Sequence, residues 1–268
     1  MAAQSDNHRN KSSQHIFMSI VSLLLFTTGL ILNLLFNSLV TWSSIEGMAF
    51  WGYPESIAYD NTLTTEASIS RLRCPTVLSP GEIGWAKLTI SNPNNHPIRT
   101  WISAHISQAG RSENMVRRTR SLSLSPGTAS EMVWQVTDEN TIFDRMILVR
   151  VFLRLTENHP PSRTQHCGIL FLDLVGLTGT QILWIAVLGS LILQLLGIIL
   201  WRRAWPIIQV KENLALILIL GMFLLSLIAT IGSVFSLWFL SLIGLILIPL
   251  LLFSILGYYF GKLDRQLN

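Results

Sequence analysis

Four stretches of the chain are continuously apolar and contain no charged residue. Each is about long enough to cross a hydrocarbon core of roughly 30 Å at about 1.5 Å of rise per helical residue. A backbone inside lipid must satisfy its own hydrogen bonds, so each stretch is predicted to be a helix. We therefore expect transmembrane helices over residues 16–40, 182–201, 214–235 and 237–260, with a tight turn at Ser236 between the last two.

Between the first two apolar stretches, apolar and polar residues alternate along the chain. In the run 98–106, Ile98 and Ile102 fall on one face and His105 falls on the other. A period of two is typical of strands with one buried face, and turn residues separate such runs. The spacing predicts about seven strands in about 110 residues, which is typical of a two-sheet sandwich. They are expected near 67–73, 83–91, 98–108, 115–124, 130–137, 145–156 and 166–175.

The order of turns and strands resembles a known class of domain. The segments LSPGE, LTISNPNNHPI, LSPGT and MVWQVT follow one another in residues 66–175. They resemble generic bacterial immunoglobulin-like extracellular domains, in which a Pro-Gly turn precedes a strand and an Asn-Pro turn joins the next two. The resemblance implies a fold for this part of the chain and no function, because such domains have many roles.

These patterns predict an α plus β membrane protein, with one β-sandwich inserted between the first and second of four helices. The first apolar stretch is long for the core of a signal peptide, and no A-x-A-like site follows it. An uncleaved helix is therefore favoured over a cleaved signal peptide, which stays an alternative. The expected segments are an N-terminal tail (1–15), the first helix (16–40), an aromatic-rich linker (41–65), the sandwich (66–176), the second helix (182–201), a basic loop (202–213), two further helices (214–235 and 237–260) and a C-terminal tail (261–268).

Composition and charge placement support a membrane protein and predict its orientation. Half of the residues are hydrophobic, 13% are charged, and the mean hydropathy is +0.48. Residues 41–178 balance twelve acidic against twelve basic residues, so the net charge of +4 lies beside the apolar stretches. Basic residues beside membrane helices are retained in the cytoplasm. We therefore expect both termini and residues 202–213 in the cytoplasm and the sandwich outside.

The basic excess also bears on the partners and the cellular location. The pI of about 9.4 raises nucleic acid as a partner, but the placement of the charge favours a lipid bilayer instead. No Asn-x-Ser/Thr sequence occurs in residues 41–180, which favours a bacterial source. The expected location is a bacterial-type plasma membrane, and no nucleic-acid partner is expected.

The two cysteines of the chain, Cys74 and Cys167, are 93 positions apart. Cys74 is expected at the end of the first strand and Cys167 in the last, and these strands tend to be neighbours in a sandwich. Outside the cytoplasm, thiols oxidise. A disulfide between them is therefore predicted, with two free thiols or a two-cysteine metal site as the alternatives.

The sequence contains no common catalytic, nucleotide-binding or metal-binding motif, and no ionisable residue lies inside the four apolar stretches. Ionisable residues inside a membrane mark proton and ion pathways, so the sequence argues against a pump or a proton-coupled transporter. We expect no catalytic, cofactor or metal residue. Of the histidines of the outer segment, His96 and His159 lie in turn segments and His105 is expected on an outward strand face. His159 and His166 flank one loop and could meet a metal, but solvated loop histidines are favoured.

Three groups of residues are candidates for contacts. A basic cluster on a predicted strand fits a solvated face, lipid headgroups or an acidic partner. A set of linker aromatics fits docking on the bilayer surface, on a partner or on their own domain. Polar residues inside the apolar stretches fit helix–helix hydrogen bonds, either within the chain or with a partner subunit. In order, these groups are Arg117, Arg118 and Arg120; Trp42, Phe50, Trp51, Tyr53 and Tyr59; and Asn33, Asn37 and Gln194.

Together these features predict a non-catalytic integral membrane accessory or scaffold subunit. It would present its sandwich to a larger membrane or envelope complex through a protein partner. Two alternatives stay open: a ligand-sensing or transport-assisting protein whose sandwich binds a ligand or an exported substrate, and a membrane enzyme with a dispersed site.

Overall fold

The computed structural model describes residues 2–50, 67–109, 115–154, 163–174, 176–204 and 210–267. The chain divides into two compact units. One unit comprises residues 1–38 and 184–268 and is helical; the other comprises residues 39–183 and contains the sheets.

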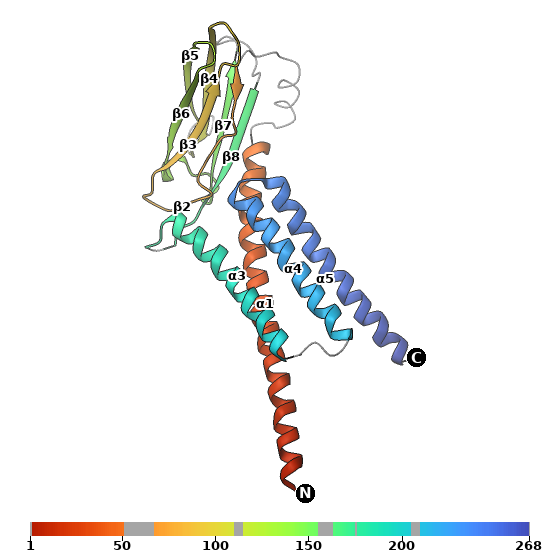
Figure 1. Ribbon diagram of the computed structural model, residues 1–268. Helices are drawn as coiled ribbons and strands as arrows, with labels where there is room; N and C mark the ends of the chain where they lie inside the picture. The colour runs from red at the N-terminus through yellow and green to blue at the C-terminus, as the bar shows by residue number, and fades with distance from the viewer. Residues whose placement is uncertain are drawn as a thin grey trace. The chain divides into compact units, whose positions relative to one another are not determined.

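The expected helical stretches lie in long helices to within one residue at each end (Figure 1). These are α1 (Ala2–Ala49), α3 (Gly179–Ala204), α4 (Val210–Val234) and α5 (Trp238–Leu267). Three described segments are long and apolar enough to cross a membrane: Phe17–Ala49, Gly179–Ala204 and Leu216–Val234. The described apolar part of α5 is shorter, Trp238–Ser254.

The helices extend beyond the expected boundaries into both tails, the linker and the basic loop, where α3 ends at Ala204 and α4 begins at Val210. The α1 helix begins at Ala2 and ends at Ala49, so it includes the expected N-terminal tail and the first part of the expected linker. The α5 helix extends to Leu267 and includes the expected C-terminal tail. No proline lies before Pro54 or after Pro249, and the polar residues Gln, Lys and Arg are good helix formers. The change from apolar to polar residues therefore marks the expected membrane boundary but does not end either helix.

The turn expected at Ser236 is confirmed, between α4 and α5. Ser236 has a positive φ of 51°. Its N–H donates to the carbonyl of Ser233 at 3.0 Å, and the N–H of Leu237 donates to the carbonyl of Gly232 at 2.6 Å. These bonds satisfy carbonyls that a helix end leaves free. A Cβ on Gly232 would collide with the backbone of Ser241, so glycine at this position lets the two helices approach closely.

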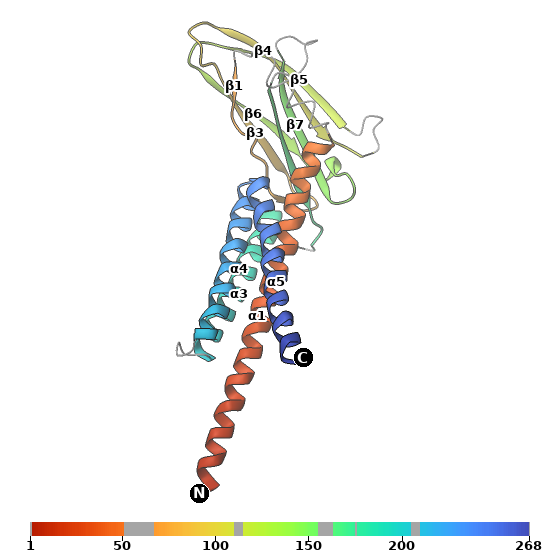
Figure 2. The ribbon, with the colours of Figure 1, turned by 90° about the vertical axis from the view of Figure 1, so that its right-hand side faces the viewer.

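The described residues contain eight strands in two sheets, which Figure 1 and Figure 2 show from two directions. The three-stranded sheet has the order β1 (Ser68–Ile69), β3 (Gly84–Ser91), β6 (Ala129–Val136). The five-stranded sheet has the order β2 (Val77–Leu78), β8 (Arg163–Phe171), β7 (Met146–Arg154), β4 (Ile98–Ser107), β5 (Met115–Leu124). The β2–β8 pair is parallel and the other pairs are antiparallel.

The first expected strand differs from the prediction. Instead of one strand over 67–73, the chain forms the short strand β1 in one sheet and then β2 in the other. Pro75 lies between them. Because proline has no N–H to donate to a ladder, it favours the point at which the chain leaves one sheet for the other.

The core lies between the two sheets. Side chains of β3 and β6, such as Leu88 and Val136, pack in one cluster with Ile102 of β4 and Val149 of β7. The β3 strand shows the alternation expected of a half-buried strand. In contrast, β4 and β7 are buried on both faces over most of their length. The outer face of the five-stranded sheet is therefore covered along these central strands.

Candidate functional site

The structure contains the disulfide between Cys74 and Cys167, with the two Cα atoms 6.5 Å apart. The predicted bridge is therefore confirmed, although Cys74 lies between β1 and β2 rather than in the first strand. Cys167 lies in β8 and faces the core, where it contacts the cluster between the sheets. The bridge ties the start of the domain to its last strand.

Charge is distributed unequally between the two sheets. The three-stranded sheet carries one lysine, Lys87, and one acidic residue, Glu131. The strands of the five-stranded sheet carry seven arginines and neither Asp nor Glu. Clustered charge of one sign produces a local potential that attracts oppositely charged partners. The arginines are Arg99, Arg117, Arg118, Arg120, Arg150, Arg154 and Arg163.

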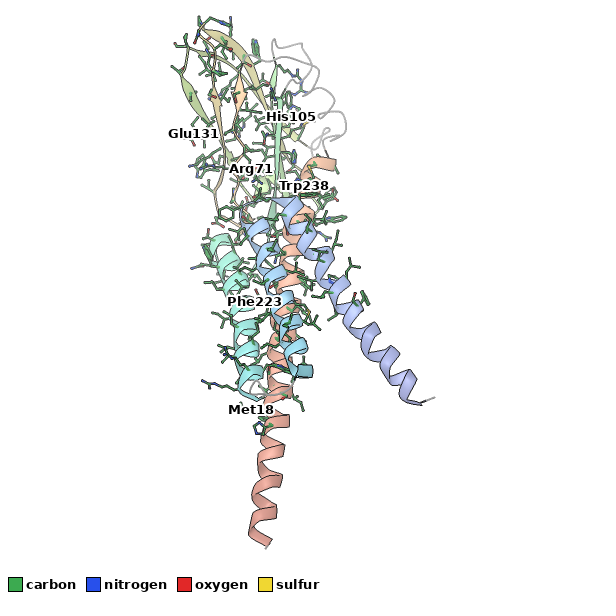
Figure 3. All side chains as sticks on the ribbon, turned by 45° about the vertical axis from the view of Figure 1, so that its right-hand side comes forward. Met18, Arg71, His105, Glu131, Phe223 and Trp238 are labelled. Carbon is green, nitrogen blue, oxygen red and sulfur yellow. A yellow bond between two sulfur atoms is a disulfide. The ribbon has the colours of Figure 1, made fainter. Side chains whose placement is uncertain are left out.

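The strand register brings basic residues into a row across the outer face of the five-stranded sheet. Arg117 of β5 pairs with His105 of β4, which pairs with Arg150 of β7, which in turn pairs with His166 of β8. Figure 3 shows His105 and Glu131 on opposite sides of the sandwich. His105 lies on the outward face, as predicted from the alternation, but only 7% of it is exposed. His166, expected to be a solvated loop histidine, instead lies in β8 and is partly buried, so that prediction is wrong.

Both histidines of this row are held in the neutral form. Burial, followed by Arg117, Arg150 and Arg154, lowers the pKa of His105 to about 4. Burial, followed by Arg150 and Arg71, lowers the pKa of His166 to about 4. Since burial and nearby cations both disfavour the imidazolium form, neither histidine is a proton donor near neutral pH. The positive charge of this face then comes from its arginines alone and does not change between about pH 5 and 8.

The side chains of this row contact one another and the ring of Phe152. The Nε of Arg117 donates to Nε2 of His105 at 3.2 Å, so Nε2 is the unprotonated nitrogen. The ring of Phe152 meets the His105 ring edge to face, with centroids 4.8 Å apart. The guanidinium carbons of Arg150 and Arg154 lie 5.3 and 4.8 Å from the Phe152 centroid, within range of a cation–π interaction. Phe152 itself is 2% exposed.

The edge strand β5 is the most exposed part of this sheet. Residues 117–121 are all exposed, including the three arginines of the predicted contact cluster, Arg117, Arg118 and Arg120. Arg118 and Arg120 pair with the buried residues Ala104 and Ile102, so they occupy positions on the core-facing side of the sheet. Because they are exposed there, the smaller sheet does not cover the middle of β5.

The aromatic residues expected in the linker are divided by the structure. Trp42 lies in α1 and is 55% exposed. Phe50 packs against Ile142, Met146 and Leu148 of its own unit, which favours docking on its own domain for this residue. The other three, Trp51, Tyr53 and Tyr59, lie outside the described residues.

The polar residues of the helices meet in one network of the helical unit. Nδ2 of Asn33 donates to the hydroxyls of Ser190 in α3 and Thr230 in α4, at 3.3 and 2.9 Å. Nδ2 of Asn37 donates to Oδ1 of Asn33 at 2.9 Å. Gln194 contacts both neighbouring helices: its Nε2 donates to the carbonyl of Gly29, and its Oε1 accepts from Ser226. These side chains join helices of the same chain.

The end of α1 and the start of α3, which belong to the same unit as the sheets, contact the sandwich. A Cβ on Gly168 of β8 would overlap the backbone of Ser43 in α1, and the Cβ of an alanine at Gly47 would lie 3.0 Å from the Cys167 backbone. At the start of α3, Oε2 of Glu82 accepts from the N–H of Gly179 at 2.8 Å and from that of Ser79 at 3.1 Å. A carboxylate at this position accepts a hydrogen bond from a free helix N–H and interacts favourably with the helix dipole.

The α3 start also borders a cavity of about 580 Å³. Its lining includes Glu82, Asp173 and Thr178. The Glu82 carboxylate is already engaged as the α3 cap, so it has a structural role in this cavity. Among the described residues, no group of three or more His, Cys, Asp or Glu side chains is arranged to hold a metal ion.

Sequence reasoning missed the burial of His105, the cap by Glu82 and the close contact at Gly168. The α3 start did carry a local signal. Thr178 and Gln181 form a reciprocal capping box, with the Thr178 N–H donating to Gln181 at 3.0 Å and the Gln181 N–H donating to Thr178 at 3.3 Å. That spacing is readable from sequence, whereas the other contacts join residues far apart in the chain.

No protein-family model and no curated protein matches this chain. Solved structures with partial similarity include the CARDB domain of a Pyrococcus furiosus protein, crystallised with di-metal ions. It is 12% identical, with 42% of this chain and 100% of that chain covered and a TM-score of 0.31. The Pseudomonas fluorescens DNA glycosylase AlkC is 13% identical, over 44% of this chain and 36% of that chain, with a TM-score of 0.30. A Listeria innocua β-glucosidase mutant is 16% identical, over 41% and 16%, with a TM-score of 0.31. Similarity this low supports no functional argument, and the description of the sandwich rests on its own strand pairing.

Proposed function

We propose that this protein is a non-catalytic membrane accessory or scaffold subunit that works by contact. Its sandwich would lie on the extracytoplasmic side and present the exposed strand β5 of the five-stranded sheet to a protein partner of a larger complex. The observation that carries this proposal is the concentration of seven arginines, without an acidic residue, in the strands of one sheet.

The attachments of the sandwich support a role in presentation. Gly168 packs on the end of α1, Glu82 caps the start of α3, and the disulfide holds β8 to the segment before β2. Side chains held by packing and hydrogen bonds lose less freedom when a partner binds, which favours affinity. These contacts all lie within the unit of residues 39–183, so they favour an ordered surface on that unit.

The membrane arrangement is part of the proposal. We infer four crossing helices, the fourth being α5, with both termini in the cytoplasm of a bacterial-type plasma membrane. Support comes from the basic residues beside the apolar stretches, including Arg202 and Arg203 in the last turn of α3, and from the retention of basic segments in the cytoplasm.

The proposal is tested by isolating the protein from its native membranes in a mild detergent. We expect a second polypeptide at a fixed ratio to the 30.1 kDa chain, resolved by size-exclusion chromatography with light scattering. A control preparation of an unrelated tagged membrane protein, washed in the same detergent, identifies abundant contaminants. Recovery of this chain alone, after chemical cross-linking in intact cells, would argue against a scaffold subunit.

A further inference from the structure

We propose that the free edge of β5 binds an extended, acidic segment of the partner protein, which adds to the five-stranded sheet as a further strand. The inference rests on the proposed function and specifies the chemistry of the partner. Throughout this subsection, the β5 edge means the side of residues 115–124 that faces away from β4.

The β5 edge has the geometry that strand addition needs. In the described part of the chain, the strand order of the sheet ends at β5. Its register with β4 continues over ten consecutive residue pairs without a bulge, from Ile98 with Leu124 to Ser107 with Met115. In an antiparallel edge strand, alternate N–H and C=O groups point away from the sheet and are available to a new strand. The sequence of β5 contains no proline that would remove one of these donors.

The side chains of β5 select for an acidic strand. Arg118 and Arg120 lie two residues apart, on the same side of the sheet, and both are exposed. Carboxylates at positions i and i+2 of an added strand would fall on one face and meet them. The guanidinium group binds a carboxylate through two parallel hydrogen bonds, which gives orientation as well as attraction.

Arginines at an edge also have a protective interpretation. Charged side chains that point toward the core side of an edge strand prevent edge-to-edge aggregation. Edges protected in nature are commonly short, bulged, interrupted by proline or covered, whereas β5 is a ten-residue strand with continuous register. This length favours a binding edge. If the arginines bind an acidic strand, removing their charge should weaken peptide binding, whereas if they protect the edge, removing their charge should cause self-association.

The test uses the full chain in nanodiscs of zwitterionic lipid. The probe is a fluorescent ten-residue peptide that alternates Glu and Val, and the control peptide replaces every Glu with Gln. We expect the Glu peptide to bind, to bind less tightly as salt is raised, and to bind at least about tenfold better than the Gln peptide. Equal binding of both peptides would overturn the proposed acidic specificity.

Paired variants locate the site. We expect Arg118→Glu/Arg120→Glu to reduce the affinity for the Glu peptide by roughly tenfold or more. The matched control is Arg99→Glu/Arg163→Glu, which changes the net charge equally at two exposed arginines of the same sheet. An equal loss in both variants would overturn a specific edge site. If the first variant does not fold, as judged by its melting temperature, Arg118→Gln/Arg120→Gln replaces it.

Hydrogen exchange tests the mode of binding. We expect the Glu peptide to slow exchange in residues 115–124 and to leave exchange in β3 and β6 unchanged. Slowed exchange elsewhere, or none, would overturn strand addition. Strand addition would also be overturned if the protein bound phosphatidylglycerol vesicles more tightly than the Glu peptide and this binding depended on the same arginines. It would be overturned as well if the charge-removed variant self-associated while its affinity for the peptide stayed unchanged. If the variant at Arg118 and Arg120 still forms the native complex, the β5 inference is wrong but the proposed scaffold function is still supported.

Discussion

Gly168 of β8 lies so close to the backbone of Ser43 in α1 that no side chain fits between them. On the opposite side of the contact, Gly47 of α1 brings the helix within reach of the Cys167 and Gly168 backbone. Glycine at both positions lets a helix lie directly on a strand. The contact attaches the end of α1 to the sheet that carries the arginines.

We expect Gly168→Ala to lower the free energy of unfolding of the sandwich by about 1–3 kcal/mol, because the added Cβ must displace the helix backbone. Thermal unfolding of the purified full chain, followed by near-ultraviolet circular dichroism, measures the loss. The matched control is Gly189→Ala in α3, where the added Cβ would meet no atom within 4 Å. A melting temperature equal to that of the control would contradict the close contact.

Asn33 is expected to stabilise the helical unit through its bonds to Ser190 and Thr230. Replacing Asn33 with leucine removes these bonds and leaves the two hydroxyl partners buried without them. We therefore expect the free energy of unfolding to decrease by about 1–2 kcal/mol. Thr28→Leu, at an exposed position of the same helix, is the control. Unfolding in mixed detergent micelles measures both, and equal stability of the two variants would show that the network contributes little.

Reduction of the Cys74–Cys167 bridge should lower the melting temperature of the sandwich. The bridge closes a loop with a sequence separation of 93 residues, for which the chain-entropy model gives a contribution of about 4–5 kcal/mol. Alkylation of unreduced protein followed by mass spectrometry should detect no free thiol, and Cys74→Ser/Cys167→Ser should reproduce the effect of reduction. Two readily alkylated cysteines in native protein would refute the bridge.

The stability of the sandwich should decrease as the pH is lowered from about 6.5 toward 4. In the folded protein the pKa of His105 and that of His166 are each about 4, below the value of about 6.5 in an unfolded chain. Between about pH 6.5 and 4, the unfolded state binds more protons than the folded state. The free energy of unfolding therefore decreases as the pH is lowered, by on the order of 1 kcal/mol per histidine after solvent screening.

Denaturant unfolding at pH 7.5 and at pH 4.5 measures this effect. The variant His105→Gln/His166→Gln should lose less stability between the two pH values than the wild-type protein, because it lacks both titrating groups. An equal decrease in variant and wild type would assign the pH dependence to other residues.

Topology is tested with single added cysteines, because the two native cysteines are bonded to each other. Ser5→Cys and Ile208→Cys should react with a membrane-impermeant maleimide only after the cytoplasmic side is opened. Thr89→Cys, at an exposed position of β3, should react in intact cells. Labelling at position 208 from outside would contradict the proposed four-helix topology.

Local patterns were sufficient to predict most strands and helices of this protein, but not the division of the first strand into β1 and β2. The alternation of Ile98, Ile102 and His105 predicts a strand because the two faces of a strand repeat every second residue. Four uncharged apolar stretches predict helices because a lipid environment leaves the backbone no other partners. The pairing of Cys74 with Cys167 followed from the expected neighbours in a sandwich and is present in the structure.

The tertiary structure decided how those elements meet. His105 was placed on the outward face from sequence, but its burial and low pKa depend on Phe152 and three arginines, which come from other strands. Glu82 caps a helix that begins 97 residues later. The position of β5 at the edge likewise follows from the order of the described strands in the sheet. A residue's spacing determines which face it occupies, whereas its burial, its pKa and its partners depend on segments distant in sequence that only folding brings together.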